Sequence, residues 1–189
     1  MENYNAKVAE LAEIGVDLMH PEGGPPFMVR GYKAEQEIVS GWEEKYKIPI
    51  FTSGMSQTEA LRALGIKKFV GCTYYRDKKL NDLFTRYFID AGFDVLGMEG
   101  MDTSPGEADK ISTEAIYQHL KSSFNKHPTA QGIYLLGSGA WQVKDIIAIE
   151  NDIGVPVVHP VAARVWYVQK KLRVRNPIKG ASRLLEEIP

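Results

Sequence analysis

The sequence predicts an α/β fold with parallel sheets, built as two pseudo-symmetric halves that enclose a cleft. Strand-like and helix-like segments alternate along its 189 residues, a pattern typical of parallel sheets covered by helices on both faces. One unit occurs twice: a β-branched run around a proline, at 48–52 and 155–159, leads into an apolar helix. Each copy follows a strand that ends in glycines, at 16–24 and 132–139. A repeated unit of this kind places a site between the halves, where strand ends meet.

Periodicity of the apolar residues assigns the helices in order along the chain. In the helix expected at 3–14, one face carries Val8, Leu11 and Ala12. In the helix expected at 32–46, Trp42 lies on the inner face. The helix expected at 112–125 has an N-cap signal at its start, Ser112 or Thr113. The helices are expected at 3–14, 32–46, 56–65, 78–91, 112–125, 141–152 and 161–172.

Short β-branched and aromatic runs between these helices predict the strands. They are expected at 15–20, 48–52, 68–72, 93–96, 132–136 and 155–158. The longest irregular stretch is expected at 98–111, where Gly100, Pro105 and Gly106 interrupt any regular pattern. The repeat favours a first half-domain made of residues 1–56 and 160–189 and a second made of residues 57–159.

Composition excludes several classes of function. The net charge of −1 leaves no electrostatic footprint for nucleic acid, and the basic run 170–175 is interpreted as a solvated helix end. No apolar run approaches the ~18 residues of a membrane span, so no membrane partner is expected. One cysteine, Cys72, excludes an internal disulfide framework and predicts a reducing, cytoplasmic location.

The chemistry is expected in four loops that follow strand ends. They are residues 20–26, 52–54, 72–75 and 137–139, the last with His159 beside it. Glycines let backbone N–H groups approach an anion, and helix N-termini favour negative charge. The expected ligand is therefore a small molecule with a carboxylate or phosphate group. The dinucleotide motif Gly-x-Gly-x-x-Gly does not follow a first strand, so no nucleotide cofactor is predicted.

Proton chemistry is assigned to two histidines, one from each half. Imidazole titrates near neutral pH, which suits a general acid or base. His159 is the preferred catalytic residue and His20 the alternative, while Glu22 could act as a base if it is partly buried. A role in hydrogen-bonding the loop backbone, or for Glu22 a solvated surface position, stays open. Their spacing does not favour a metal site, so none is predicted.

Three segments carry a family resemblance: FTSGMSQTEALRALGIKKFVGCTYY, AGFDVLGMEGM and IGVPVVHPVAARVW. They resemble the aspartate/glutamate/hydantoin racemase superfamily, in particular its branch of arylmalonate decarboxylase and maleate isomerase. The resemblance runs from about Ala6 to Leu185. It implies two flavodoxin-like half-domains, a site between them, no cofactor, and a tyrosine at Tyr75 that binds a substrate carboxylate.

The sequence departs from that family at the catalytic thiols. The first cysteine position falls on Gly23 and the second on Gly137, and Gly24 and Pro25 replace the oxyanion-binding hydroxyls. Family members also begin with an additional strand, roughly fifty residues earlier by typical domain lengths. We therefore expect the first half-domain to lack its first strand.

Cys72 stands in the run GCTYY, which superficially resembles the family's catalytic Cys-Thr. By alignment it lies instead on the first strand of the second half. It is therefore a structural thiol or a pocket nucleophile, and its exposure and pKa decide between these roles.

The resemblance implies a cofactor-independent decarboxylase or isomerase of a small carboxylic or dicarboxylic acid, acting through a carbanion or enolate. The alternative is a non-catalytic carboxylate-binding protein that kept the fold. The sequence leaves open whether the chain forms a homo-oligomer. The expected substrate-binding residues are Gly23, Gly24, Thr52, Ser53, Thr73, Tyr75, Gly137, Ser138 and Gly139.

Overall fold

The computed structural model describes residues 1–103, 107, 110–137 and 146–189. Its helices are α1 (Glu2–Ile14), α2 (Pro25–Met28), α3 (Tyr32–Tyr46), α4 (Ser53–Ala63), α5 (Lys78–Asp90), α6 (Thr113–Lys126), α7 (Ile146–Ile153), α8 (Pro160–Lys171) and α9 (Arg183–Glu187). Its strands are β1 (Lys68–Thr73), β2 (Asp94–Gly100), β3 (Ile133–Leu136) and β4 (Val157–Val158). The α/β class predicted from the sequence is confirmed.

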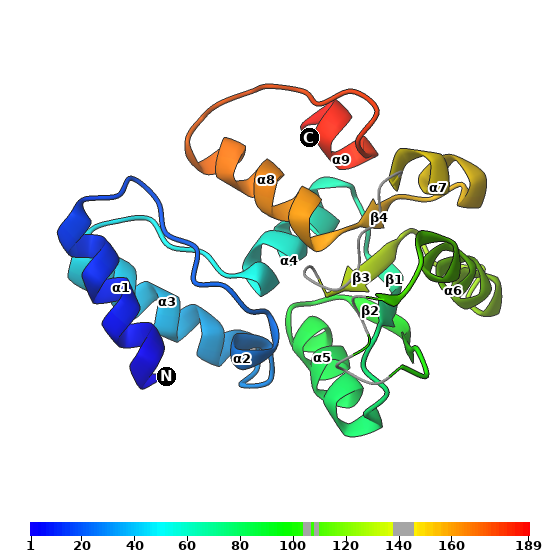
Figure 1. Cartoon of the computed structure of the whole chain (residues 1–189), viewed down its shortest axis with the longest axis horizontal. Helices are drawn as coiled ribbons and strands as arrows, with labels where there is room; N and C mark the ends of the chain where they lie inside the picture. The colour runs from blue at the N-terminus through cyan, green and yellow to red at the C-terminus, as the bar shows by residue number, and fades with distance from the viewer. Residues whose placement is uncertain (104–106, 108–109, 138–145) are drawn as a thin grey trace.

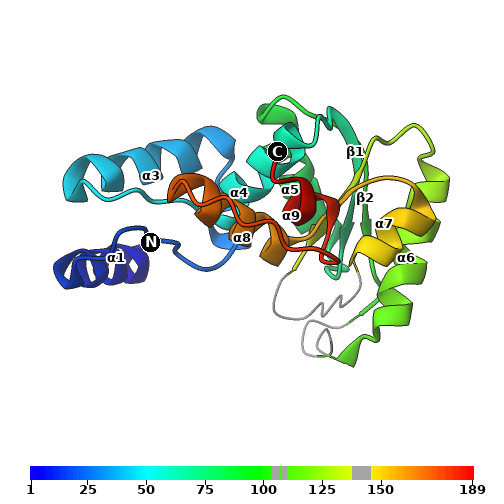
Figure 2. The same cartoon turned by 90° about the horizontal axis from the view of Figure 1, so that it is seen from above.

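The four strands form one parallel sheet in the order β2-β1-β3-β4. Helices α6 and α7 cover one face of this sheet, and α4, α5 and α8 lie on the other (Figure 2). Strand β1 is buried from Phe69 to Thr73, as expected for a central strand covered on both faces. Cys72 faces this interior with no exposed surface.

Helices α1 and α3 extend away from the sheet as a second, smaller body (Figures 1 and 2). Its core consists of Val8, Met19, Phe27, Val39, Trp42 and Ile50. The segment 160–189 contributes Trp166 and Leu184 to the larger core, although α8 runs between the two bodies (Figure 1). The division of the chain into half-domains at 56 and 160 stays a prediction.

The strands expected at 15–20 and 48–52 are reduced to a single parallel bridge between Met19 and Ile50. Its two hydrogen bonds run from Met19 N to Pro49 O, at 3.0 Å, and from Phe51 N to Met19 O, at 3.1 Å. Pro49 and Pro21 lack an N–H donor, so the ladder cannot continue far on either side. The bridge still brings the segment after Met19 beside the segment after Ile50.

Helix α2 joins the two cores and was not expected from the sequence. Pro25 and Pro26 occupy its first turn, where a missing N–H costs nothing and φ is already helical. Phe27 packs into the smaller core and Met28 into the larger one, and both are fully buried. This short helix therefore fixes the preceding glycines, Gly23 and Gly24, against both bodies.

Candidate functional site

A cleft of about 420 Å³ lies where the two bodies meet. Its lining comes from the loop before α2, the first turns of α4 and α8, and the ends of β1 and β3. The lining residues are Glu22, Gly23, Gly24, Pro25, Pro26, Ser53, Gln57, Tyr74, Tyr75, Leu136, Gly137 and Pro160. Its size fits a small organic ligand.

Five of the predicted substrate-binding residues line this cleft: Gly23, Gly24, Ser53, Tyr75 and Gly137. The structure thus brings together four loops that are far apart in the sequence. Gly23 and Gly137 have φ angles of 109° and 115°, in the region that favours glycine. A Cβ on Gly23 would also lie 2.9 Å from the Tyr4 hydroxyl. The backbone therefore favours glycine at both positions.

Two predicted binding residues lie behind the cleft wall. Thr52 is fully buried; its hydroxyl caps α4 by accepting from Met55 N, at 3.1 Å, and donates to Glu35, at 2.7 Å. Thr73 is also buried, and its hydroxyl donates to Asn81 at 2.9 Å. Both hydroxyls hold the loops that carry cleft residues. Ser138 and Gly139 lie outside the described residues, and binding by these four residues stays a prediction.

The Tyr75 side chain pairs with that of its neighbour in sequence, Tyr74. The Tyr74 and Tyr75 hydroxyls are hydrogen-bonded to each other at 3.0 Å. Burial, together with Tyr74, raises the pKa of Tyr75, so it remains a neutral donor. Asn81 fixes the loop by donating to the Tyr75 carbonyl at 2.8 Å.

The two histidines have different environments. His159 is 5 % exposed and is the N-cap of α8, where its Nδ1 accepts from Val161 N at 3.2 Å. The cleft lining includes its neighbour Pro160 but not His159. His20 instead contacts a cleft residue, because its Nε2 lies 3.3 Å from the Ser53 hydroxyl. Catalysis by either histidine stays a prediction.

Glu22 lines the cleft and is paired with two side chains. Its Oε2 lies 2.8 Å from Arg164 Nη1 and 3.5 Å from His20 Nδ1. Its Oε1 accepts from Arg164 Nη2 at 3.1 Å. The paired carboxylate is 60 % exposed and so lies largely in solvent, and catalysis by Glu22 stays a prediction.

Sequence reasoning missed Gln57 and Leu136, whereas Tyr74 lies in the loop 72–75 that was expected to carry the chemistry. Gln57 lies four residues after Ser53 on α4, so helical spacing could have placed both on one face. Its amide donates to the Leu135 carbonyl at 3.2 Å and so connects α4 to β3. Cys72 is not in the cleft; burial raises its pKa to about 12, which identifies a structural thiol.

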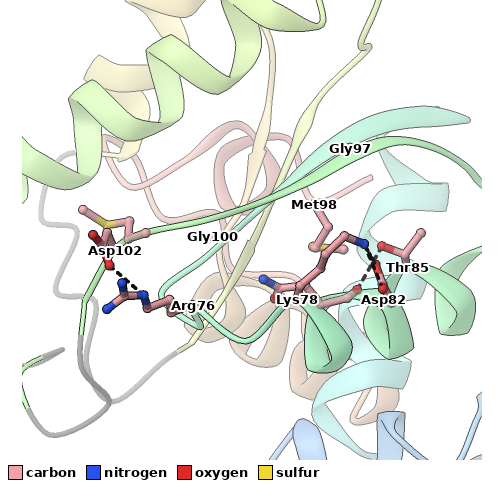
Figure 3. A pocket seen from close by; sticks show the side chains of 10 residues that line it. Arg76, Lys78, Asp82, Thr85, Gly97, Met98, Gly100 and Asp102 are labelled. Atoms are coloured by element: carbon pink, nitrogen blue, oxygen red, sulfur yellow. Dashed lines mark hydrogen bonds and ion pairs between the residues drawn. The ribbon is translucent and has the colours of Figure 1, made fainter.

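A larger cavity of about 520 Å³ lies at the outer edge of the sheet, between β2 and α5 (Figure 3). Its charged side chains are paired with one another: Arg76 with Asp102 at 2.9 Å, and Lys78 with Asp82 at 3.0 Å. These groups are mostly exposed, and none was predicted to bind substrate. We therefore place the functional site in the smaller cleft.

Among the described residues, no group of His, Cys, Asp and Glu side chains is arranged to hold a metal ion. In the same part of the chain, no helix is long and apolar enough to cross a membrane.

Comparisons with known proteins agree with the fold. A solved structure of arylmalonate decarboxylase covers 97% of this chain and 84% of its own, with a TM-score of 0.88 and 21% identity. Maleate cis-trans isomerase from Nocardia farcinica covers 97% of this chain and 78% of its own, with a TM-score of 0.86 and 19% identity. These similarities confirm the predicted fold of two flavodoxin-like halves.

A curated sequence relative gives a consistent result. Arylmalonate decarboxylase from Bordetella bronchiseptica is 24% identical over 138 residues, which are 72% of this chain. The matched region spans 57% of that relative's length. The family model described as arylmalonate decarboxylase matches residues 1–185. The chain therefore belongs to the arylmalonate decarboxylase family.

Proposed function

We propose that the cleft binds a small carboxylic or dicarboxylic acid and decarboxylates or isomerises it without a cofactor. The observation that carries this proposal is the convergence of Gly23, Gly24, Ser53, Tyr75 and Gly137 on one cleft. Two glycine turns leave room for a carboxylate to approach the backbone closely. The neutral Tyr75 hydroxyl supplies a donor that stays protonated across the physiological range.

The charge that develops in such a reaction is negative. Loss of CO₂, or removal of a proton beside a carboxyl group, leaves a carbanion whose charge spreads onto enolate oxygens. Helix α4 begins at the cleft with Ser53, so the positive end of its dipole favours these oxygens. Tyr75 donates to them, and fixed donors of this kind stabilise a transition state more than a flexible solvent does.

The names of the relatives suggest the first substrates to test. Purified protein should be incubated with phenylmalonate, maleate and a series of small dicarboxylates, with CO₂ release and isomer composition measured by NMR. Turnover of at least one of them that disappears in a Ser53→Ala, Tyr75→Phe double variant would support the proposal. Equal rates in the two proteins would contradict it.

A second function is favoured by the two glycines at the thiol positions. A protein without either thiol could bind the carboxylate and perform no chemistry. Calorimetric binding of a dicarboxylate, with no turnover over days and weaker binding in Tyr75→Phe, would identify this alternative.

Tyr75→Phe should weaken ligand binding, or lower kcat/KM, by about 1.5–3 kcal/mol, the usual value of a hydrogen bond to a charged group. The ring and its packing on Phe84, at a centroid distance of 5.8 Å, are retained. Titration calorimetry measures the effect, and Tyr117→Phe on α6, outside the cleft, is the matched control. Unchanged affinity would remove Tyr75 from the site.

No racemisation by a two-thiol route is expected for aspartate, glutamate or hydantoins. Both thiol positions carry glycine, and both backbones have positive φ angles. NMR in D₂O measures exchange at Cα. Robust exchange in the wild-type protein would overturn this expectation.

His159→Ala should lower the free energy of unfolding by about 0.5–2 kcal/mol, because the N-cap of α8 is lost. His159→Asn should recover most of it, since an Asn oxygen can accept from Val161 N. Urea denaturation measures both. In the stable Asn variant, a loss of turnover of about 10²–10⁴-fold would show that the imidazole also carries a proton.

A further inference from the structure

Ser53, His20 and Glu22 are arranged in a line, and the order of these three groups points to a reaction beyond the proposed decarboxylation or isomerisation. The Ser53 hydroxyl lies 3.3 Å from His20 Nε2, and His20 Nδ1 lies 3.5 Å from Glu22 Oε2. The two ring nitrogens thus face a hydroxyl on one side and a carboxylate on the other. This is the order of groups in a hydroxyl nucleophile, its base and the group that orients the base.

Each member is held in place by its surroundings. Arg164 binds both oxygens of Glu22, at 2.8 and 3.1 Å, and so fixes the carboxylate. The His20 ring packs edge-on against Phe51, at a centroid distance of 4.6 Å, and its side chain is 13 % exposed. Ser53 is the first residue of α4 and is set by the helix itself.

Two members of this line, Ser53 and Glu22, line the cleft, whereas His20 is not among its lining residues. Of the two, Ser53 carries the hydroxyl that can act as a nucleophile. Gly24 stands beside Ser53, because a Cβ built on Gly24 would lie 3.8 Å from the Ser53 Cβ. The absence of a side chain there keeps the approach to the hydroxyl open.

The protonation state of His20 suits a base. Burial, and next Arg164, lower its pKa to about 4, against the opposing effect of Glu22. Tyr4 and Lys7 on α1 share a groove with the ring. The imidazole is therefore neutral at neutral pH. In the tautomer that carries its proton on Nδ1, this proton faces Glu22 and Nε2 can accept the Ser53 proton.

We propose that Ser53 is a nucleophile activated by His20, and that the cleft transfers the acyl group of a small ester to Ser53 and then to water. As the Ser53 oxygen bonds to the carbonyl carbon, its proton moves to His20 Nε2. The C–O bond to the leaving alcohol breaks, and that alcohol takes the proton from His20. Water, deprotonated by the same nitrogen, then releases the acid and restores the Ser53 hydroxyl.

A fluorophosphonate probe tests the nucleophile without reference to decarboxylation. Diisopropyl fluorophosphate should give one adduct, with loss of fluoride, that peptide mass spectrometry places on Ser53. The labelling rate should rise with pH around a midpoint near 4, the pKa of His20. Labelling of wild-type protein that is no faster than that of Ser53→Ala, or an adduct on another residue, would overturn the proposal.

Two variants separate the chemistry from the fold. His20→Gln should slow labelling by about 10²-fold or more, whereas Ser122→Ala, which removes an exposed hydroxyl on α6, should label at the wild-type rate. Ser53→Cys gives a positive signal: iodoacetamide should alkylate position 53 while Cys72 stays unmodified. An unreactive thiol at position 53 in folded protein would contradict the proposal.

p-Nitrophenyl acetate tests the full cycle. An initial burst of one nitrophenolate per protein, followed by slower turnover, is expected because the acyl-serine forms before water releases it. The burst should be absent in Ser53→Ala. A burst of equal size in that variant would contradict acyl transfer through Ser53.

Discussion

In a His20→Gln variant, turnover of a carboxylic acid by the cleft should fall by about 10²–10⁴-fold, the range of general acid–base participation. His20 is the histidine whose ring reaches a cleft residue, Ser53, and Gln keeps a polar side chain of similar length. Steady-state kinetics measures the loss, with circular dichroism to confirm the fold. Wild-type turnover in this variant would exclude His20.

The pH dependence of the turnover rate provides a second test of His20. In an isomerisation in which His20 removes a proton from the substrate, the base acts in its unprotonated form, so the wild-type rate should rise with pH through the His20 pKa of about 4 and then level off. A midpoint near the ordinary histidine value of about 6.5 would contradict this assignment. His127→Gln is the matched control, because His127 pairs with Glu99 at 3.2 Å away from the cleft lining, and it should keep wild-type turnover.

Gly54→Ala should lower the free energy of unfolding by about 2–5 kcal/mol, because it combines overpacking with the loss of a buried hydrogen bond. A Cβ at this position would lie 2.6 Å from the Tyr87 hydroxyl and 2.9 Å from Glu35 Oε1. Glu35 has no exposed surface, and it accepts from both Tyr87 and Thr52. This network joins the two bodies, so disturbing it should loosen their contact.

Urea denaturation measures the effect, and Gly41→Ala is the matched control. Gly41 lies inside α3, and no atom stands within 4 Å of a Cβ built there. Alanine in a helix interior is favoured over glycine by about 0.5–1 kcal/mol, so this variant should be unchanged or more stable. Equal loss of unfolding free energy in the two variants would show that the buried Glu35 network does not determine the effect of Gly54→Ala.

The longer helices of this chain could be predicted from local signals. Apolar periodicity places α1 at Glu2–Ile14 and α3 at Tyr32–Tyr46, close to the expected ranges, and Ser112 caps α6 as expected. The prediction of strands at 15–20 and 48–52 was wrong. A strand forms only where a partner segment pairs along its length, and here the pairing ends after one bridge. Helix α2 was missed because four residues carry no periodicity.

The position of the site was predictable, but the partnerships within it were not. Glycines after strand ends and the position of Tyr75 indicated the cleft. The contact between His20 and Ser53 depends on the bridge of Met19 with Ile50, which aligns two loops across the smaller body. For His159, the alternative of a hydrogen bond to the backbone was open from the sequence, and the structure places that bond at the N-cap of α8.

The buried position of Cys72 has a practical consequence. It is the only cysteine of the chain, it lies in the central strand β1, and burial raises its pKa to about 12. A thiol reagent therefore reaches it only when the sheet opens. The rate of its modification reports how often the larger core opens, so this side chain provides an intrinsic probe of local unfolding without any introduced label.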